Sequence, residues 1–189
     1  MAKKLALSLM LGCTFTLSAL QEILLPLPPG PSNVTIHTGP LTDYSRLDPL
    51  APKPEPRALM VNVYQPRNCS QTTTVPYMPE PLATIYGQNI SAASGTGSNL
   101  TFAPLQMQAC PNEATVDECG KGIDAPLVLF SPGTYGSRLE FGFLAAAVAS
   151  YGYTVVTVDH PYETYFIEYP DGHLVSAATY SCAIFSLED

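Results

Sequence analysis

The chain has no tryptophan, only three histidines, and only eight lysine and arginine residues against sixteen acidic residues. Its formal net charge of −8 offers no basic surface for phosphates, which excludes nucleic acid as a partner. His37, His160 and His173 are widely separated, and no two cysteines have the spacing of a zinc site. We therefore expect no metal and no other cofactor.

Long apolar runs are also scarce, because the first twenty residues contain the only one. Lys3 and Lys4 precede an apolar stretch from Leu5 to Leu17, and small residues follow it. This order is typical of an export signal, and the stretch is short for a membrane-spanning helix. We predict a signal peptide at residues 1–20, no transmembrane segment after its removal, and a secreted, extracellular protein.

Four Asn-x-Ser/Thr sequons lie behind this leader, at Asn33, Asn68, Asn89 and Asn99. Together with an export signal they indicate a glycosylated eukaryotic secretory protein. The alternative is that a region rich in Ser, Thr and Asn produces such tripeptides through its composition alone.

Four of the five cysteines follow the leader: Cys69, Cys110, Cys119 and Cys182. An even number in an oxidising compartment favours two disulfides, and four cysteines allow three pairings. The short interval between Cys110 and Cys119 makes a local loop disulfide plausible.

Proline divides the mature chain. Residues 21–56 are rich in proline, which removes backbone donors, so we expect an extended arm with a short edge strand at 34–38 and no central strand. Residues 57–189 form the second region, a partial α/β domain that opens with alternating apolar positions ended by Pro66. We interpret Gln71–Leu105 as a loop region with a possible short helix near 81–85, and Cys110–Gly122 as a hydrophilic connector.

The stretch from Ala125 to His160 carries the clearest pattern. An apolar run at 127–130 predicts a strand buried on both faces, and a second run at 153–158 predicts another. Between them Ser137 can cap a helix to about Ser150, ended by Gly152. Its expected buried stripe is Leu139, Phe143, Leu144 and Val148. Strand, helix and strand in this order predict a parallel crossover, with a tight loop where such sheets place their chemistry.

Several of these motifs resemble a known family. They are Phe130-Ser-Pro-Gly-Thr-Tyr-Gly-Ser-Arg138, the Asp159-His-Pro strand end, Tyr169-Pro-Asp-Gly172, Arg46-Leu-Asp-Pro49 and the strand beginning at Arg57. The stretch from about Gly39 to Gly172 resembles the α/β-hydrolase group of fungal proteins similar to platelet-activating-factor acetylhydrolase. The resemblance implies the amino-terminal part of an α/β-hydrolase sheet. It also implies a cofactor-free esterase that cleaves short acyl esters of glycerophospholipids, or another small ester, with a Ser–Asp–His triad.

Residue by residue, the resemblance carries over only one catalytic group. The family's oxyanion N–H comes from the residue after the glycine, which is Thr134 here, although Thr134-Tyr135-Gly136 departs from the family pattern. No serine stands in a Gly-x-Ser-x-Gly elbow. In the family the elbow, acid and histidine all follow the region that matches Gly172. We therefore expect a truncated chain without nucleophile or triad, inactive as it stands.

Two adjacent residues could be taken as a substitute catalytic pair. Neighbouring strand residues point to opposite faces, so Asp159 and His160 cannot form a relay, and His160 is better explained as a turn residue. We also expect the last strand, at 154–158, to have an unpaired edge that promotes aggregation. The alternatives to the esterase are a non-catalytic secreted glycoprotein and an α/β-hydrolase acting on other carboxyl esters.

Overall fold

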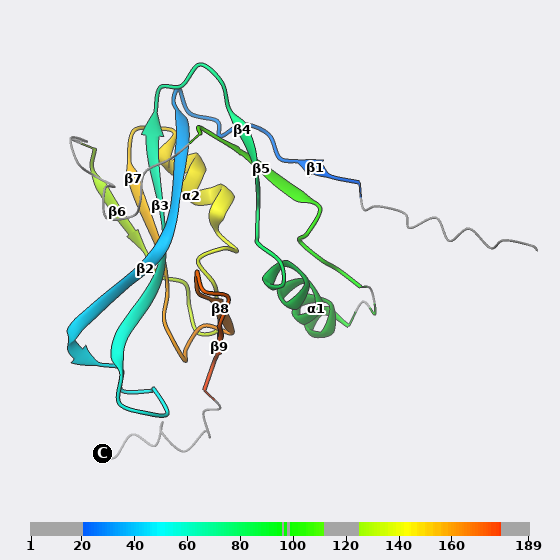
Figure 1. The fold of residues 1–189 in the computed structure, drawn as a ribbon. Coiled ribbons are helices and arrows are strands. Elements are labelled where there is room, and N and C mark those ends of the chain that lie inside the picture. The colour runs from blue at the N-terminus through cyan, green and yellow to red at the C-terminus, as the bar shows by residue number, and fades with distance from the viewer. Residues whose placement is uncertain (1–20, 96, 98, 112–124, 179–189) are drawn as a thin grey trace, which may run out of the picture.

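The computed structural model describes residues 21–95, 97, 99–111 and 125–178. Its main sheet has four strands in the order β2-β3-β7-β6 (Figure 1). The strands are β2 (Asn33–Leu47), β3 (Pro56–Arg67), β7 (Thr154–Asp159) and β6 (Leu127–Phe130). β3 is antiparallel to both β2 and β7, whereas β6 and β7 are parallel. The parallel pair confirms the predicted strand–helix–strand unit.

The crossover helix α2 (Gly142–Ala149) begins later than predicted. Its N-cap position is Phe141, and no side chain caps it. Ser137 is instead fully buried, and its hydroxyl accepts a hydrogen bond from the Leu139 N–H at 3.2 Å. The prediction that Ser137 caps the helix is therefore wrong, because a side chain committed to the loop cannot serve the helix end.

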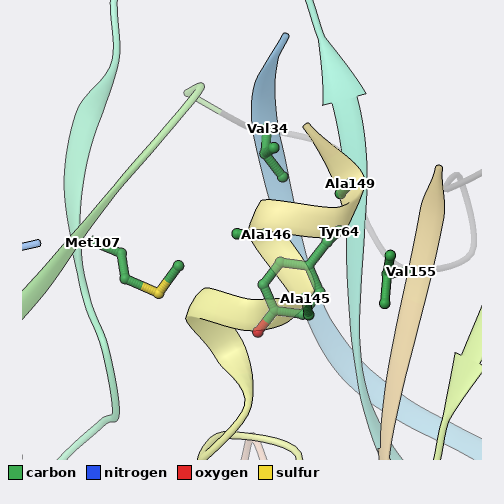
Figure 2. Packing of buried hydrophobic residues seen from close by; sticks show 7 residues of the cluster. All are labelled: Val34, Tyr64, Met107, Ala145, Ala146, Ala149 and Val155. Carbon is green, nitrogen blue, oxygen red and sulfur yellow. The ribbon is translucent and has the colours of Figure 1, made fainter. Parts of the chain in front are cut away.

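The buried face of α2 agrees with the expected stripe in part. Leu139 is buried just before the helix, and Phe143 and Val148 pack against the core, whereas Leu144 is exposed. The most buried side chains of the helix are those of Ala145, Ala146 and Ala149. Small side chains allow a close approach, and at the first residue, Gly142, an added Cβ would stand 3.1 Å from the Tyr64 hydroxyl. In Figure 2 the helix lies between Met107 on one side and the strands that carry Tyr64 and Val155 on the other.

A smaller sheet lies beyond α2. It contains β1 (Ile23–Leu24), β5 (Leu105–Ala109) and β4 (Thr73–Pro76) in the order β1-β5-β4. Its Met107 joins the α2 core, so two sheets enclose this helix. The region 71–105, predicted to be mostly loop, thus supplies strand β4, and it also supplies helix α1 (Leu82–Ser94), which is longer than the helix expected near 81–85.

Helix α1 forms a second core with the last hairpin. Its Leu82, Ala83 and Tyr86 pack with Met78 and Leu139. The hairpin consists of β8 (Phe166–Glu168) and β9 (Leu174–Ser176). The Tyr86 hydroxyl donates to the Phe166 oxygen at 2.9 Å and accepts from the Phe166 N–H at 3.2 Å, which fixes α1 to β8.

The ends of the sheet correct three expectations. β2 is an edge strand, as expected, but it has fifteen residues instead of covering only 34–38, and it includes Pro40. A missing N–H is tolerated at the edge of a sheet. Leu127 and Leu129 of β6 are 61% and 70% exposed, so this strand is not buried on both faces. β7 is paired on both sides, so the expected unpaired edge is wrong. Within the described residues the second edge is β6.

One disulfide, Cys69–Cys110, joins the end of β3 to the end of β5. The expected local bond between Cys110 and Cys119 is therefore wrong, because Cys110 is already paired. Cys119 and Cys182 lie outside the described residues, as does the predicted signal peptide. None of the helices in the described ranges is long and apolar enough to span a membrane.

Candidate active site

The loop after β6, residues 131–136, lies at the carboxyl end of the parallel pair of strands. Within it the Gly136 N–H donates to the Gly133 oxygen at 2.9 Å, which closes a tight turn. Thr134 lies inside this turn and is exposed, and its amide forms no hydrogen bond with any described residue. The N–H singled out from the sequence is therefore free, at the sheet edge where such folds bind ligands.

The shape of this turn does not depend on Gly133. An added Cβ at Gly133 would have no neighbour within 4 Å, and its φ is not in the left-handed region. Gly136 is the crowded position, because its added Cβ would stand 2.9 Å from the Pro132 Cβ. The left-handed residue is Tyr135, with φ of 67°. A large side chain in that region is uncommon and is held there by its surroundings.

Tyr135 is held by the segment that follows β7. Its N–H donates to the Glu163 oxygen at 3.1 Å, and its own oxygen accepts from the Tyr165 N–H at 3.2 Å. These two bonds form a parallel bridge between Tyr135 and Thr164. The strained residue therefore ties the loop after β6 to the loop after β7.

A serine and a histidine form a second tie between these loops. The Ser131 hydroxyl and Nε2 of His160 lie 2.8 Å apart. The other ring nitrogen of His160, Nδ1, is buried and has no partner among the described residues. In a serine triad a carboxylate orients this second nitrogen. Ser131 and His160 thus lack the third group of a triad, which agrees with the sequence reading of His160 as a turn residue.

Asp159 is not available as that third group, because Arg138 engages it. The two side chains are 0% and 2% exposed and form an ion pair through Oδ2 and Nη1. Oδ1 of Asp159 also accepts the Arg138 backbone N–H at 2.5 Å. Burial raises the pKa of Asp159, while the Arg138 charge and hydrogen bonds oppose this effect. The pair fixes the chain after the loop to the end of β7.

The Arg138 guanidinium extends this contact into the sheet. Its Nε donates to Oδ1 of Asn62 at 3.0 Å, and Asn62 Nδ2 donates to the Tyr64 hydroxyl at 3.2 Å. Burial raises the pKa of Tyr64, so its phenol stays neutral. Sequence reasoning missed this buried network. The one available signal was a single arginine just before an apolar helix.

A cavity of about 410 Å³ lies beside the strained loop residue. Its walls include Tyr135, Tyr165 and Phe166, and Asn89 of α1 lies at its side. The rings of Tyr165 and Phe166 meet edge to face with centroids 4.8 Å apart. An aromatic wall of this kind can hold an apolar or planar group beside Tyr135, the residue that follows Thr134.

The other candidate residues are scattered. Asn68, Asn89 and Asn99 are exposed, whereas Asn33 is half-buried and its side-chain amide donates to the Cys69 oxygen at 3.1 Å. His37 is buried in β2, and His173 is exposed beside Asp171. In the part of the chain that the structure describes, no three His, Cys, Asp or Glu side chains group as metal ligands.

Two known esterases are similar to this chain. A curated protein of Arthroderma benhamiae, described as a probable 1-alkyl-2-acetylglycerophosphocholine esterase, is 34% identical over 162 residues, which are 82% of this chain and 41% of that protein. The solved structure of a ferulic acid esterase from Streptomyces cinnamoneus superposes on this chain with a TM-score of 0.61 and 28% sequence identity. The match covers 82% of this chain and 41% of the esterase chain. No family model matches the sequence.

The chain thus spans about two fifths of the length of each relative. Both relatives are described as esterases, which supports the resemblance to a family of esterases that the motifs indicated. By sequence and by fold, the chain is related to esterases and has an α/β-hydrolase-like architecture.

Proposed function

We propose that these residues are the amino-terminal part of a carboxylic-ester hydrolase that works through an acyl-serine intermediate. The observation that carries the proposal is the free Thr134 amide at the carboxyl end of β6, in a chain related to two esterases. A fixed N–H at this position can stabilise the negative charge that develops on an ester oxygen during attack.

The chemistry needs groups outside this sequence. A serine hydroxyl attacks the ester carbonyl, its proton passes to a histidine, and the tetrahedral oxyanion forms beside the Thr134 N–H. Collapse expels the alcohol, and water then releases the acid. No Gly-x-Ser-x-Gly elbow occurs in the 189 residues, so we expect the chain alone to be inactive. Loss of nucleophile and base removes about six decades of rate.

For the substrate we propose a short acyl ester of a glycerophospholipid, hydrolysed by a secreted glycoprotein. This rests on the motifs around Gly133 and on the description of the Arthroderma relative. A second candidate is an aryl ester, favoured by the aromatic wall of Tyr135, Tyr165 and Phe166 and by the relation to a ferulic acid esterase. A non-catalytic glycoprotein is the third possibility.

The test uses the protein translated from the complete coding sequence and a matched pair of substitutions. Thr134→Pro deletes the N–H, whereas Thr134→Ala changes the side chain and keeps it. We expect Thr134→Pro to lower kcat by about 10²–10³-fold, as removal of an oxyanion donor does elsewhere. Thr134→Ala should stay close to the unsubstituted enzyme. A urea midpoint for each variant verifies that the fold is kept.

Substrate choice is decided in the same preparation. Hydrolysis of 2-acetylglycerophosphocholine esters over methyl ferulate supports the phospholipid proposal, and the reverse order supports the aryl ester. Equal losses of kcat for Thr134→Pro and Thr134→Ala would refute the role of the amide. A complete protein that hydrolyses neither ester and does not react with an organophosphate would refute the enzyme proposal altogether.

A further inference from the structure

A separate cavity has no lining residue from the loop 131–136. It has a volume of about 660 Å³ and is bounded by the far ends of β2 and β3 and by the segment 161–175. Met60 of β3 pairs with Asp159, the last residue of β7, so residues 56–58 extend past the end of β7. Figure 1 shows these ends of β2 and β3 projecting beyond β7.

Three tyrosines supply aromatic surface to this cavity: Tyr44, Tyr162 and Tyr169. Tyr44 is 85% exposed, so its side chain contributes little to the packing of the fold. The Tyr169 hydroxyl donates to the Ala58 oxygen at 2.6 Å, and its ring stacks on His173 with centroids 4.4 Å apart. The Tyr169 ring is thus held in place before any ligand arrives.

Tyr162 is also held in place. Its φ of 64° lies in the left-handed region, and its hydroxyl donates to Oε1 of Glu55 at 2.5 Å. A bulky residue in this region costs free energy and persists only where its surroundings impose it. Backbone and hydroxyl together therefore fix this ring at the cavity wall.

The charge in the cavity is negative. Asp48, Glu55 and Asp171 line it, and the described lining residues include no lysine or arginine. Asp171 already pairs with His173 at 2.6 Å, and Glu55 accepts from Tyr162. Asp48 is different, because it is only 7% exposed and one of its oxygens lacks a partner. Its Oδ1 accepts the Leu50 N–H at 2.9 Å, whereas its buried Oδ2 has none among the described residues.

Asp48 lines the cavity and has no cationic partner among the described residues, so a positive charge in the cavity would be favourable. We propose that this cavity binds an organic ammonium ion, with Asp48 as counter-charge and the faces of Tyr44, Tyr162 and Tyr169 as the cation–π surface. Tyrosine faces attract cations that are too weakly hydrated to need oxygen ligands. An anion would meet only repulsion here, and no described trio of side chains could complete a metal site.

This inference goes beyond the proposed function and does not depend on ester hydrolysis. It is tested by binding on the chain itself, so its failure leaves the esterase proposal standing. The probe is choline, and its control is 3,3-dimethyl-1-butanol, which has the same shape and hydroxyl but no charge. Since the chain contains eleven tyrosines and no tryptophan, tyrosine fluorescence reports the titration, and calorimetry verifies it.

We expect choline to bind saturably and the neutral alcohol to bind at least about tenfold more weakly, since the charge supplies the attraction. Asp48→Asn should weaken choline binding by about tenfold. The control is Asp43→Asn, which removes the same charge from the same hairpin at a residue that does not line the cavity. The affinity of this variant for choline should stay within about twofold of that of the unsubstituted chain.

Tyr44→Ala provides an independent variant, because an exposed side chain can be removed without disturbing the core. It should weaken choline binding by about threefold. Equal affinity for choline and the neutral alcohol would overturn the proposal. So would equal losses in Asp48→Asn and Asp43→Asn, or unaltered binding in Tyr44→Ala. A change in thermal midpoint identifies any variant that fails to fold, and the comparison then rests on Tyr44→Ala and the two probes.

Discussion

At the scale of single residues, the buried Arg138–Asp159 pair is a costly interaction to break. Both groups have given up their hydration, so the free energy of the pair depends on the quality of its geometry. Here the carboxylate also accepts the Arg138 N–H, and the guanidinium also donates to Asn62. Removal of one partner leaves the other charged, buried and uncompensated.

We predict that Asp159→Asn lowers the free energy of unfolding by about 3–5 kcal/mol, because it strands the Arg138 charge in the interior. Urea denaturation followed by circular dichroism measures this change. The matched control is Asp43→Asn, which breaks the exposed pair with Arg46 and should leave the midpoint unchanged within error. An Asp159→Asn midpoint equal to that of the control would contradict the role given to this pair.

Contacts of this kind were largely beyond sequence reasoning. Ser131 and His160 are 29 positions apart, and Arg138 and Asp159 are 21 apart, so their meeting depends on the register of β6 and β7. A Gly-x-x-Gly sequence also does not say which residue of the turn is left-handed, and in the structure it is Tyr135. Only the place of Thr134, at the end of a predicted strand, could be deduced, since strand ends follow from apolar runs.

At the scale of elements, tyrosine hydroxyls join parts of the chain that are distant in sequence. Tyr86 connects α1 to β8, and the Tyr77 hydroxyl donates to the Glu140 oxygen at 2.6 Å, just before α2. Burial raises the pKa of Tyr86 to about 12 and that of Tyr77 to about 12, from an ordinary value of 10. Each helix therefore depends on phenols that must stay protonated.

These pKa values predict alkaline unfolding. The folded chain holds the phenolic protons more tightly than the unfolded chain, so this stabilisation is complete below about pH 10 and is lost as the pH rises toward 12. Urea midpoints measured between pH 8 and 12 should fall through this window. Tyr86→Phe should be less stable at pH 8 and should show a smaller fall. A midpoint independent of pH would show that the phenols titrate normally.

The elements that sequence reasoning found and missed differ in their patterns. The alternation after Arg57 and the two apolar runs around α2 have clear periods, and β3, β6 and β7 were found there. α1 was underestimated, because its buried face is narrow and its sequence is rich in small and polar residues. β2 was underestimated because it lies in a proline-rich region, although an edge strand tolerates its one proline, Pro40.

The disulfide is an element-scale correction that can be verified directly. Cleavage after the methionines and after Glu113, without reduction, places the cysteines on separate peptides. We expect peptide 61–78, with Cys69, to remain linked to peptide 108–113, with Cys110, because their Cα atoms are 6.0 Å apart in the fold. A linked product that contains Cys110 and Cys119 instead would restore the local pairing inferred from the short interval.

At the scale of the whole molecule, strand order decides which surfaces are left uncovered. Sequence reasoning placed the uncovered edge at 154–158, because that strand comes last in the clear pattern. In the structure the antiparallel strand β3 covers that side of β7, and β6 becomes the outer strand. No local pattern could have shown this, since the order of strands in a sheet depends on pairings between segments about a hundred residues apart.

Leu127 and Leu129 alternate along the outer strand β6 with two side chains that face the α2 side. Val128 packs against the core there. The ring centroids of Phe130 and Phe141 are 4.7 Å apart. The two leucines therefore share the opposite face, beside unpaired backbone groups. An exposed apolar edge of this kind is a template for pairing with another chain. The predicted self-association is thus kept, but its site moves from β7 to β6.

We predict that Leu129→Lys reduces self-association of the 189-residue chain, because a charged side chain on an edge strand blocks edge-to-edge pairing. Light scattering coupled to size-exclusion chromatography should show a smaller assembled fraction than for the unsubstituted chain. The matched control is Leu144→Lys, which places the same charge at an exposed leucine of helix α2 rather than on a strand. If both lysines act equally, net charge rather than the edge governs association. If the unsubstituted chain is already monomeric, β6 is not an adhesive edge, and the exposure of its leucines needs another explanation.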